Sequence, residues 1–168
     1  MAVYTRVSED ELATFLSEFD IGEATSFSGI TEGVENSNFR LSTTAGDYIL
    51  TLYEKRVNKK DLPFFINLMS HLFENRISCP LPVADKNGVV LKELNQRAAA
   101  IVTFLTGTSS NKPNPDRCYS AGIALAKLHL AAADFTIPRK NALDSKAWAP
   151  LLASCNVEDS DIDPALIV

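Results

Sequence analysis

The segment Asn38–Tyr53, NFRLSTTAGDYILTLY, decides the fold of this chain. Its first part, as far as Thr43, alternates in polarity with Phe39 and Leu41 on one face, a period of two that is typical of a half-buried strand. The sequence AGD at 45–47 predicts a tight turn. The part that follows, Tyr48–Tyr53, is apolar on both faces, as expected for a strand in the middle of a sheet. The segment therefore predicts two neighbouring antiparallel strands.

Three more strands are expected around this pair. One is Thr25–Ile30, and the turn-prone residues 31–37 join it to the next strand. The other two, Val89–Leu94 and Ala98–Leu105, are expected to pair across the NQR sequence at 95–97, after a hairpin turn at residues 85–88. Together these segments predict a five-stranded antiparallel sheet, interrupted after its third strand by a helix.

Helices are expected before, within and after the strands. Ser8 and Glu11 form a capping box at the start of the first helix. A second helix begins near Asp61 and ends before the CPLP sequence at 79–82. A third runs from Asp116 to about Ala133, and residues 148–152 form a short helical piece. The apolar face expected for the second helix consists of Phe65, Leu68, Met69, Leu72 and Phe73.

Composition and charge exclude several classes of protein. The 168 residues carry a formal net charge of −5, with 46% apolar and 22% charged side chains, as in an ordinary globular protein. No nucleic-acid partner is expected, since such binding needs clustered Lys and Arg. No membrane partner is expected either, because no apolar run approaches ~18–20 residues.

Cysteine and histidine usage points to the cytoplasm. Cys79, Cys118 and Cys155 are widely spaced, and no CxxC pair occurs. Scattered thiols without a secretory signal favour a reducing compartment. Two histidines are too few, and too far from any CxxC pair, for a usual zinc site, which leaves a carboxylate-held metal open.

A set of colinear segments resembles a known family. The segments are GITEGVENSNFRLST at 29–43, YILTLYEKR at 48–56, DLPFFINLMSHL at 61–72, CPLP at 79–82, IVTFLTG at 101–107 and ALAKLHLA at 124–131. They resemble the homoserine kinases of the aminoglycoside phosphotransferase and choline kinase superfamily. Generic motifs add nothing, because no GxxxxGK[ST], GxGxxG, GxSxG or HExxH occurs.

The resemblance implies an α+β fold and a metabolic kinase. It implies a protein-kinase-like small lobe at residues 1–106, a hinge at 107–115 and an incomplete helical C-terminal lobe at 116–168. The implied reaction is transfer of the γ-phosphoryl group of ATP, with Mg²⁺, to the hydroxyl of L-homoserine, a small amino-alcohol, in threonine biosynthesis. Other acceptors, similar to choline or an aminoglycoside, stay open, and so does a non-catalytic nucleotide-binding or interaction module.

The first implied nucleotide contacts lie in the segment that joins the first two strands. Gly33 would let the backbone approach a ligand closely. Asn36 and Ser37, with neighbouring backbone N–H groups, could hydrogen-bond to nucleotide phosphates. From the residues alone, a polar turn without a ligand is the plainer interpretation, and the resemblance favours a loop that covers a nucleotide.

The remaining implied contacts lie on the third strand and at the hinge. Thr51 stands where protein kinases place a phosphate-binding Lys, which leaves Lys55 and Arg56 as candidate cations. From the residues alone, these two are more simply interpreted as surface charges. Thr103, Phe104 and Leu105 stand where the family binds adenine through backbone groups.

The catalytic loop of the family, HxDxxxxN, does not occur in the sequence. Phosphoryl transfer depends on positioning and on charge neutralisation by metal, so no catalytic residue is assigned. We therefore expect the chain to be a truncated form that is inactive alone, with its metal ligands in the absent part. We also expect self-association through the apolar face of the helix that begins at Asp116.

Overall fold

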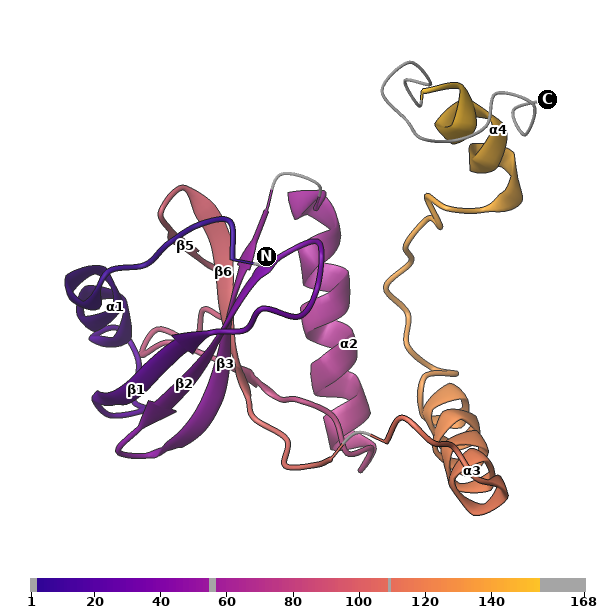
Figure 1. Cartoon of the computed structure of the whole chain (residues 1–168), viewed down its shortest axis with the longest axis horizontal. Helices are drawn as coiled ribbons and strands as arrows, with labels where there is room; N and C mark the ends of the chain where they lie inside the picture. The colour runs from indigo at the N-terminus through magenta and orange to yellow at the C-terminus, as the bar shows by residue number, and fades with distance from the viewer. Residues whose placement is uncertain (1–2, 55–56, 109, 155–168) are drawn as a thin grey trace. The chain divides into compact units, whose positions relative to one another are not determined.

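The computed structural model describes residues 3–54, 57–108 and 110–154 of the chain. Its internal contacts divide the chain into one unit at residues 1–137 and another at 138–168. Among the described residues, the first unit contains the sheet and three α-helices, and the second contains one helix (Figure 1). The expected small lobe, hinge and C-terminal lobe stay a prediction. No helix in the described ranges is long and apolar enough to cross a membrane.

An antiparallel sheet forms the centre of the first unit. In its described part the strands are β1 (Ala24–Gly29), β2 (Ser37–Thr43), β3 (Gly46–Tyr53), β4 (Pro82–Val83), β5 (Lys92–Leu94) and β6 (Arg97–Thr103). Their spatial order is β1-β2-β3-β6-β4, and β5 pairs with the end of β6 that β4 leaves free. The described sheet thus has six strands where five were expected.

The strand that the sequence did not predict is β4. It is two residues long and begins with a proline, which cannot donate a ladder hydrogen bond, so it carries little strand signal. The strand expected at Val89–Leu94 is correspondingly shorter, beginning at Lys92. Its turn into β6 also differs from the prediction, because Leu94 pairs with Arg97 and leaves only Asn95 and Gln96 in the turn.

The deciding segment folds as predicted. β2 and β3 pair from Ser37–Leu52 to Thr43–Gly46, and β3 lies between β2 and β6. Leu50 and Leu52 are fully buried on one face of β3. They join Phe39 and Leu41 of β2 in the main hydrophobic core.

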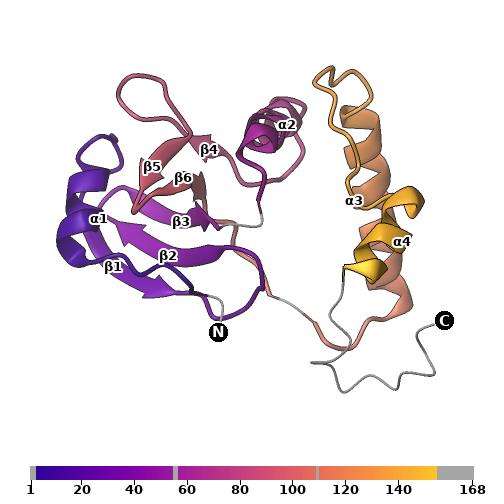
Figure 2. The ribbon, with the colours of Figure 1, turned by 90° about the horizontal axis from the view of Figure 1, so that it is seen from above.

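Helix α1 (Glu9–Leu16) covers this core. Its capping box is present, because Ser8 Oγ accepts from the Glu11 amide and the Glu11 carboxylate accepts from the Ser8 amide. Leu12, Phe15 and Leu16 are buried against the sheet. Figures 1 and 2 show the sheet between α1 and the next helix, α2 (Leu62–Glu74).

Helix α2 buries only part of the face that the sequence predicted. Leu62, Ile66 and Leu72 are buried, whereas Phe65 and Phe73 are 38% and 49% exposed. Apolar residues occupy most positions of this helix, so its sequence is compatible with more than one buried face. Packing against the rest of the chain decides which face is buried. A short 3₁₀ turn, η1 (Lys59–Asp61), precedes it.

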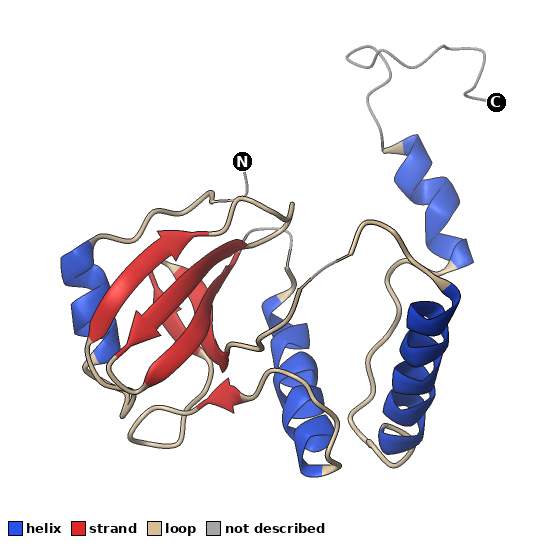
Figure 3. Cartoon of the chain, turned by 60° about the horizontal axis from the view of Figure 1, so that its bottom comes forward, coloured by secondary structure: helices blue, strands red, loops and turns tan. Residues whose placement is uncertain are grey.

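The described chain beyond β6 contains helices and loops (Figure 3). In α3 (Pro115–Ala131), Asn114 caps the first turn by accepting from the Arg117 amide at 2.9 Å. His71 on α2 contacts the end of α3, with Nε2 2.8 Å from the Ala131 carbonyl oxygen. In the second unit, α4 (Ser145–Ala153) is capped by Asp144.

Candidate nucleotide site

The loop at residues 30–36 joins β1 to β2, and we call it the 30–36 loop. Its base is closed by the Ile30 amide, which donates to the Asn38 carbonyl at 2.8 Å. Gly33 has a φ of +110°, and a Cβ added there would meet no atom within 4 Å. The left-handed backbone favours glycine, and the open space leaves this part of the loop accessible to a ligand.

Asn36 presents an unsatisfied acceptor at the end of this loop. Its Oδ1 atom is buried and has no hydrogen-bond partner in the described structure. Buried polar atoms in proteins are almost always paired, so an acceptor without a partner among the described residues suits a donor from a bound ligand or a water molecule. Of the residues that the sequence singled out, Asn36 therefore carries the clearest sign of a missing ligand.

Ser37 has a structural role that the sequence did not reveal. It is fully buried, and its Oγ atom accepts from the amides of Tyr4 and Thr5 at 2.8 and 3.0 Å. The same hydroxyl donates to Glu54 Oε1 at 2.6 Å, which uses its hydrogen-bonding capacity in full. Its hydroxyl is therefore not free to meet phosphates, which corrects the expectation for this side chain.

Glu54 and Arg97 complete this network. Arg97 Nε lies 2.7 Å from Glu54 Oε2, and the two side chains are 27% and 10% exposed. Burial raises the pKa of Glu54, but hydrogen bonds from Ser37, Thr5 and Arg97 outweigh it and lower the pKa overall. The pair stays ionised and fixes the end of β3 against β6. No sequence signal pointed to it, since its partners are separated by 17 and 43 residues.

Thr51 faces away from the main core. It is half-buried, and its Oγ1 atom donates to Asn38 Oδ1 at 2.8 Å across the β2–β3 pair. Thr51 occupies the position on β3 at which protein kinases place a phosphate-binding lysine. Lys55 and Arg56, the candidate cations, lie outside the described residues.

The expected adenine-binding residues lie at the end of β6. The Thr103 amide donates to the Leu81 carbonyl at 2.9 Å, and the Phe104 amide donates to the Asp47 carbonyl at 3.0 Å. The Arg40 guanidinium stacks on the Phe104 ring, 4.2 Å from its centroid. Because the first two amides are used within the protein, a ligand contact through an amide falls on Leu105, whose side chain is 44% exposed.

The two groups of residues lie at opposite ends of β3. Leu52 pairs with Ser37 beside the 30–36 loop, and Tyr48 pairs with Thr103 beside the predicted hinge. Four residues of strand span roughly 13 Å. Thr51 and Asn38 lie between the ends, on the face of the sheet away from the main core. The arrangement suits an elongated ligand rather than a compact one.

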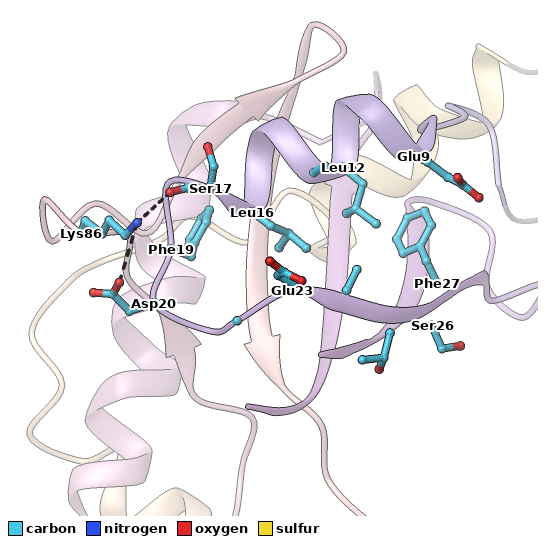
Figure 4. A pocket seen from close by; sticks show the side chains of 14 residues that line it. Glu9, Leu12, Leu16, Ser17, Phe19, Asp20, Glu23, Ser26, Phe27 and Lys86 are labelled. Carbon is cyan, nitrogen blue, oxygen red and sulfur yellow. Dashed lines mark hydrogen bonds and ion pairs between the residues drawn. The ribbon is translucent and has the colours of Figure 1, made fainter. Parts of the chain in front are cut away.

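A pocket of about 940 Å³ lies elsewhere, between α1 and β1 (Figure 4). None of the residues predicted to bind nucleotide lines it. Its lysine, Lys86, is already engaged, with Nζ 2.9 Å from the Ser17 carbonyl oxygen and 3.8 Å from Asp20 Oδ1. Glu9 and Glu23 add further negative charge to the lining, so this pocket does not suit phosphates.

The described residues offer no metal site. No group of three or more His, Cys, Asp or Glu side chains among them could hold an ion.

Comparison with known proteins decides the family. Residues 26–165 match the model of a phosphotransferase enzyme family, APH. The chain belongs to this family. Among solved structures, a spectinomycin phosphotransferase in complex with ADP and spectinomycin resembles this phosphotransferase-family chain with a TM-score of 0.66. The two are 13% identical, and the match covers 95% of this chain and 50% of the other.

Curated relatives in the phosphotransferase family are more similar in sequence. The homoserine kinase of Bradyrhizobium diazoefficiens is 54% identical over 166 residues, which cover 99% of this chain and 51% of the relative. The homoserine kinase of Xanthobacter autotrophicus is 55% identical, and the match covers 99% of this chain and 52% of the relative. The homoserine kinase of Parvibaculum lavamentivorans is 55% identical over 155 residues, and the match covers 92% of this chain and 48% of the relative. The chain thus spans about half the length of the curated relatives it matches.

Proposed function

We propose that this chain forms the nucleotide-binding part of a homoserine kinase. The complete reaction would transfer the γ-phosphoryl group of ATP to the hydroxyl of L-homoserine, in threonine biosynthesis. The observation that carries the proposal is the 54% identity to a homoserine kinase over 99% of the chain. A cytoplasmic location is part of the proposal and rests on the scattered cysteines of the sequence.

The proposed nucleotide lies along β3, with its adenine at the hinge and its phosphates under the 30–36 loop. Leu105 would contact adenine through its backbone, beside Thr103 and Phe104. Gly33 and Asn36 would approach the phosphates. Two observations support this placement: the orphaned Asn36 Oδ1 atom and the open space at Gly33. The ADP bound to the spectinomycin phosphotransferase, which shares the fold, supports a nucleotide as the ligand.

Asn36 Oδ1 is an acceptor, so it would not bond to a phosphate oxygen directly. It would accept from a donor that accompanies the nucleotide, such as a ribose hydroxyl or a water molecule. Mg²⁺ would neutralise phosphate charge when bound, and no described residue is assigned as its ligand here. The proposal therefore assigns the described residues to nucleotide positioning and assigns no chemical step to them.

A chimera tests the proposal. Residues 1–168 are joined to the part of the Bradyrhizobium homoserine kinase that lies beyond the match, and ADP release is measured with homoserine, choline or spectinomycin as acceptor. We expect homoserine-dependent release by the chimera and none by the 168-residue chain alone, because the chain lacks HxDxxxxN. Asn36→Ala in the chimera should raise the KM for ATP.

The outcomes separate the alternatives. A folded chimera that binds ATP but transfers nothing would favour a non-catalytic nucleotide-binding module. Transfer to choline or spectinomycin in preference to homoserine would favour another acceptor class. Robust turnover by the 168-residue chain alone would contradict the expected inactivity.

A further inference from the structure

The segment Val3–Thr5, which we call the N-terminal strap, contacts the 30–36 loop region at three points. At the entry, Val3 packs so close to Gly29 that a Cβ added there would lie 2.8 Å from Val3 Cγ2. In the loop itself, the Tyr4 hydroxyl donates to the Val34 carbonyl at 3.0 Å. At the exit, the Tyr4 and Thr5 amides donate to Ser37 Oγ. The strap thus crosses the region from end to end.

The strap is anchored to the interior of the sheet. The Ser37 hydroxyl donates a hydrogen bond to Glu54 Oε1 at 2.6 Å, and Glu54 is paired with Arg97 at 2.7 Å. A hydrogen bond to a charged group in a half-buried place is stronger than one between neutral groups in water. The end of the loop at Ser37 is therefore fixed. The hydrogen bond from the Tyr4 hydroxyl to the Val34 carbonyl also holds the backbone next to Gly33.

The Tyr4–Val34 contact contributes little to burial. Tyr4 is 58% exposed and Val34 is 74% exposed, so their contact removes little apolar surface from water. Its physical effect is to restrict the backbone beside a glycine that has open space around it. A loop that is held in place before binding loses less conformational entropy when a ligand arrives.

We propose that the N-terminal strap positions the 30–36 loop for nucleotide phosphates, with Tyr4 as a positioning residue. This inference rests on the proposed function. The strap acts on the phosphate end of the site and leaves the adenine end, some 13 Å away along β3, unchanged. Loss of the Tyr4 hydroxyl should therefore weaken binding of ATP and leave binding of adenosine as it is.

The test compares Tyr4→Phe with the wild-type chain by calorimetric titration, using ATP with Mg²⁺ in one arm and adenosine in the other. We expect the Kd for ATP to rise about threefold, as for the loss of one exposed hydrogen bond, and the Kd for adenosine to stay constant. Tyr119→Phe is the matched control, because Tyr119 is a 73% exposed tyrosine on α3. It should change neither value.

Amide hydrogen exchange provides a second measurement without ligand. In Tyr4→Phe, exchange of the 30–36 loop should become about threefold faster, while exchange of β3 should not change. Unchanged loop exchange, or an equal loss of affinity for ATP and adenosine, would overturn the strap's role. If the wild-type chain bound neither compound, the proposed function would fail, and the strap's role in binding would fail with it.

Discussion

At the scale of single residues, Asp85 is the most strongly perturbed carboxyl group described. Its side chain is fully buried, and its Oδ2 atom lies 2.7 Å from Lys92 Nζ. Its Oδ1 atom accepts from the amides of Asn87 and Val89 at 2.9 and 2.8 Å. The hydrogen bond from Lys92, followed by that from the Val89 amide, outweighs burial and lowers the pKa of Asp85 to about 2. The residue thereby fixes the turn at 85–88 that the sequence predicted.

This shift predicts an acid dependence of stability. The folded pKa is below the unfolded value of about 3.9, so the ionised Asp85 stabilises the fold above about pH 4. That contribution is lost as the pH falls toward 2. Asp85→Asn should therefore lower the free energy of unfolding at pH 7. Between about pH 5 and 2.5 the free energy of the variant should decrease less steeply than that of the wild type, as measured by urea denaturation. Over this range the pH passes the unfolded pKa of Asp85 and approaches the folded one.

Asp20→Asn is the control for this prediction. The Asp20 side chain is 83% exposed, with its carboxylate 3.8 Å from Lys86, so its removal should change the acid dependence little. Equal slopes for wild type and Asp85→Asn would show that the ion pair with Lys92 does not govern acid stability.

At the scale of elements, the β5–β6 turn combines an uncommon backbone with a tertiary contact. Asn95 and Gln96 have φ values of 50° and 62°, the left-handed region at both turn positions. Two-residue hairpin turns need this geometry to match strand twist. The Asn95 side chain donates to the Arg6 carbonyl at 2.9 Å and to Glu11 at 3.0 Å, which joins the turn to the start of α1.

Gln96→Gly should stabilise the chain by about 0.5 kcal/mol, because glycine relieves the left-handed strain by more than it adds to unfolded-state entropy. Equilibrium urea denaturation measures the change. Gln96→Ala is the matched variant, since it keeps Cβ and should give no gain. A Gly variant no more stable than the Ala variant would contradict the strained turn.

Most of these elements were predictable, and the exceptions have physical causes. Alternation and the capping box located β2, β3 and α1, because their signals are local. The face of α2 was predicted only in part, because most positions of the helix are apolar and its sequence fits more than one buried face. β4 was missed because a two-residue strand beginning with a proline has almost no pattern. The β5–β6 turn was expected to be longer because Arg97 is polar and does not resemble a strand residue.

At the scale of the whole molecule, the described part of α3 has no buried residue. Its apolar side chains include Tyr119 at 73%, Leu125 at 54% and Leu130 at 77% exposure. Apolar surface of this kind favours association. The sequence predicted this uncovered face, and association through it stays a prediction.

Replacing Leu125 and Leu128, which lie three positions apart on one face of α3, together by Gln should raise the dissociation constant for self-association about tenfold, because the lost apolar burial is worth ~1.5 kcal/mol. Sedimentation velocity over a concentration series measures it. Leu143→Gln is the control, since Leu143 is 68% exposed but lies in the second unit. A wild-type chain that stays monomeric throughout would contradict the prediction.

The candidate site was less predictable than the fold. The sequence singled out Gly33 and Asn36, and the structure gives each a feature that suits a ligand. It did not reveal that Ser37 is committed to Tyr4, Thr5 and Glu54. Those contacts join residues 17 to 33 positions apart, and no local pattern encodes such a distance.

The most direct test of the central claim is a ¹H–¹⁵N NMR titration of the chain with ATP and Mg²⁺. The account predicts shifts at both ends of β3, at Gly33 and Asn36 and at Leu105, with the α1–β1 pocket unaffected. Shifts confined to that pocket, or no shifts at saturating ATP, would contradict it.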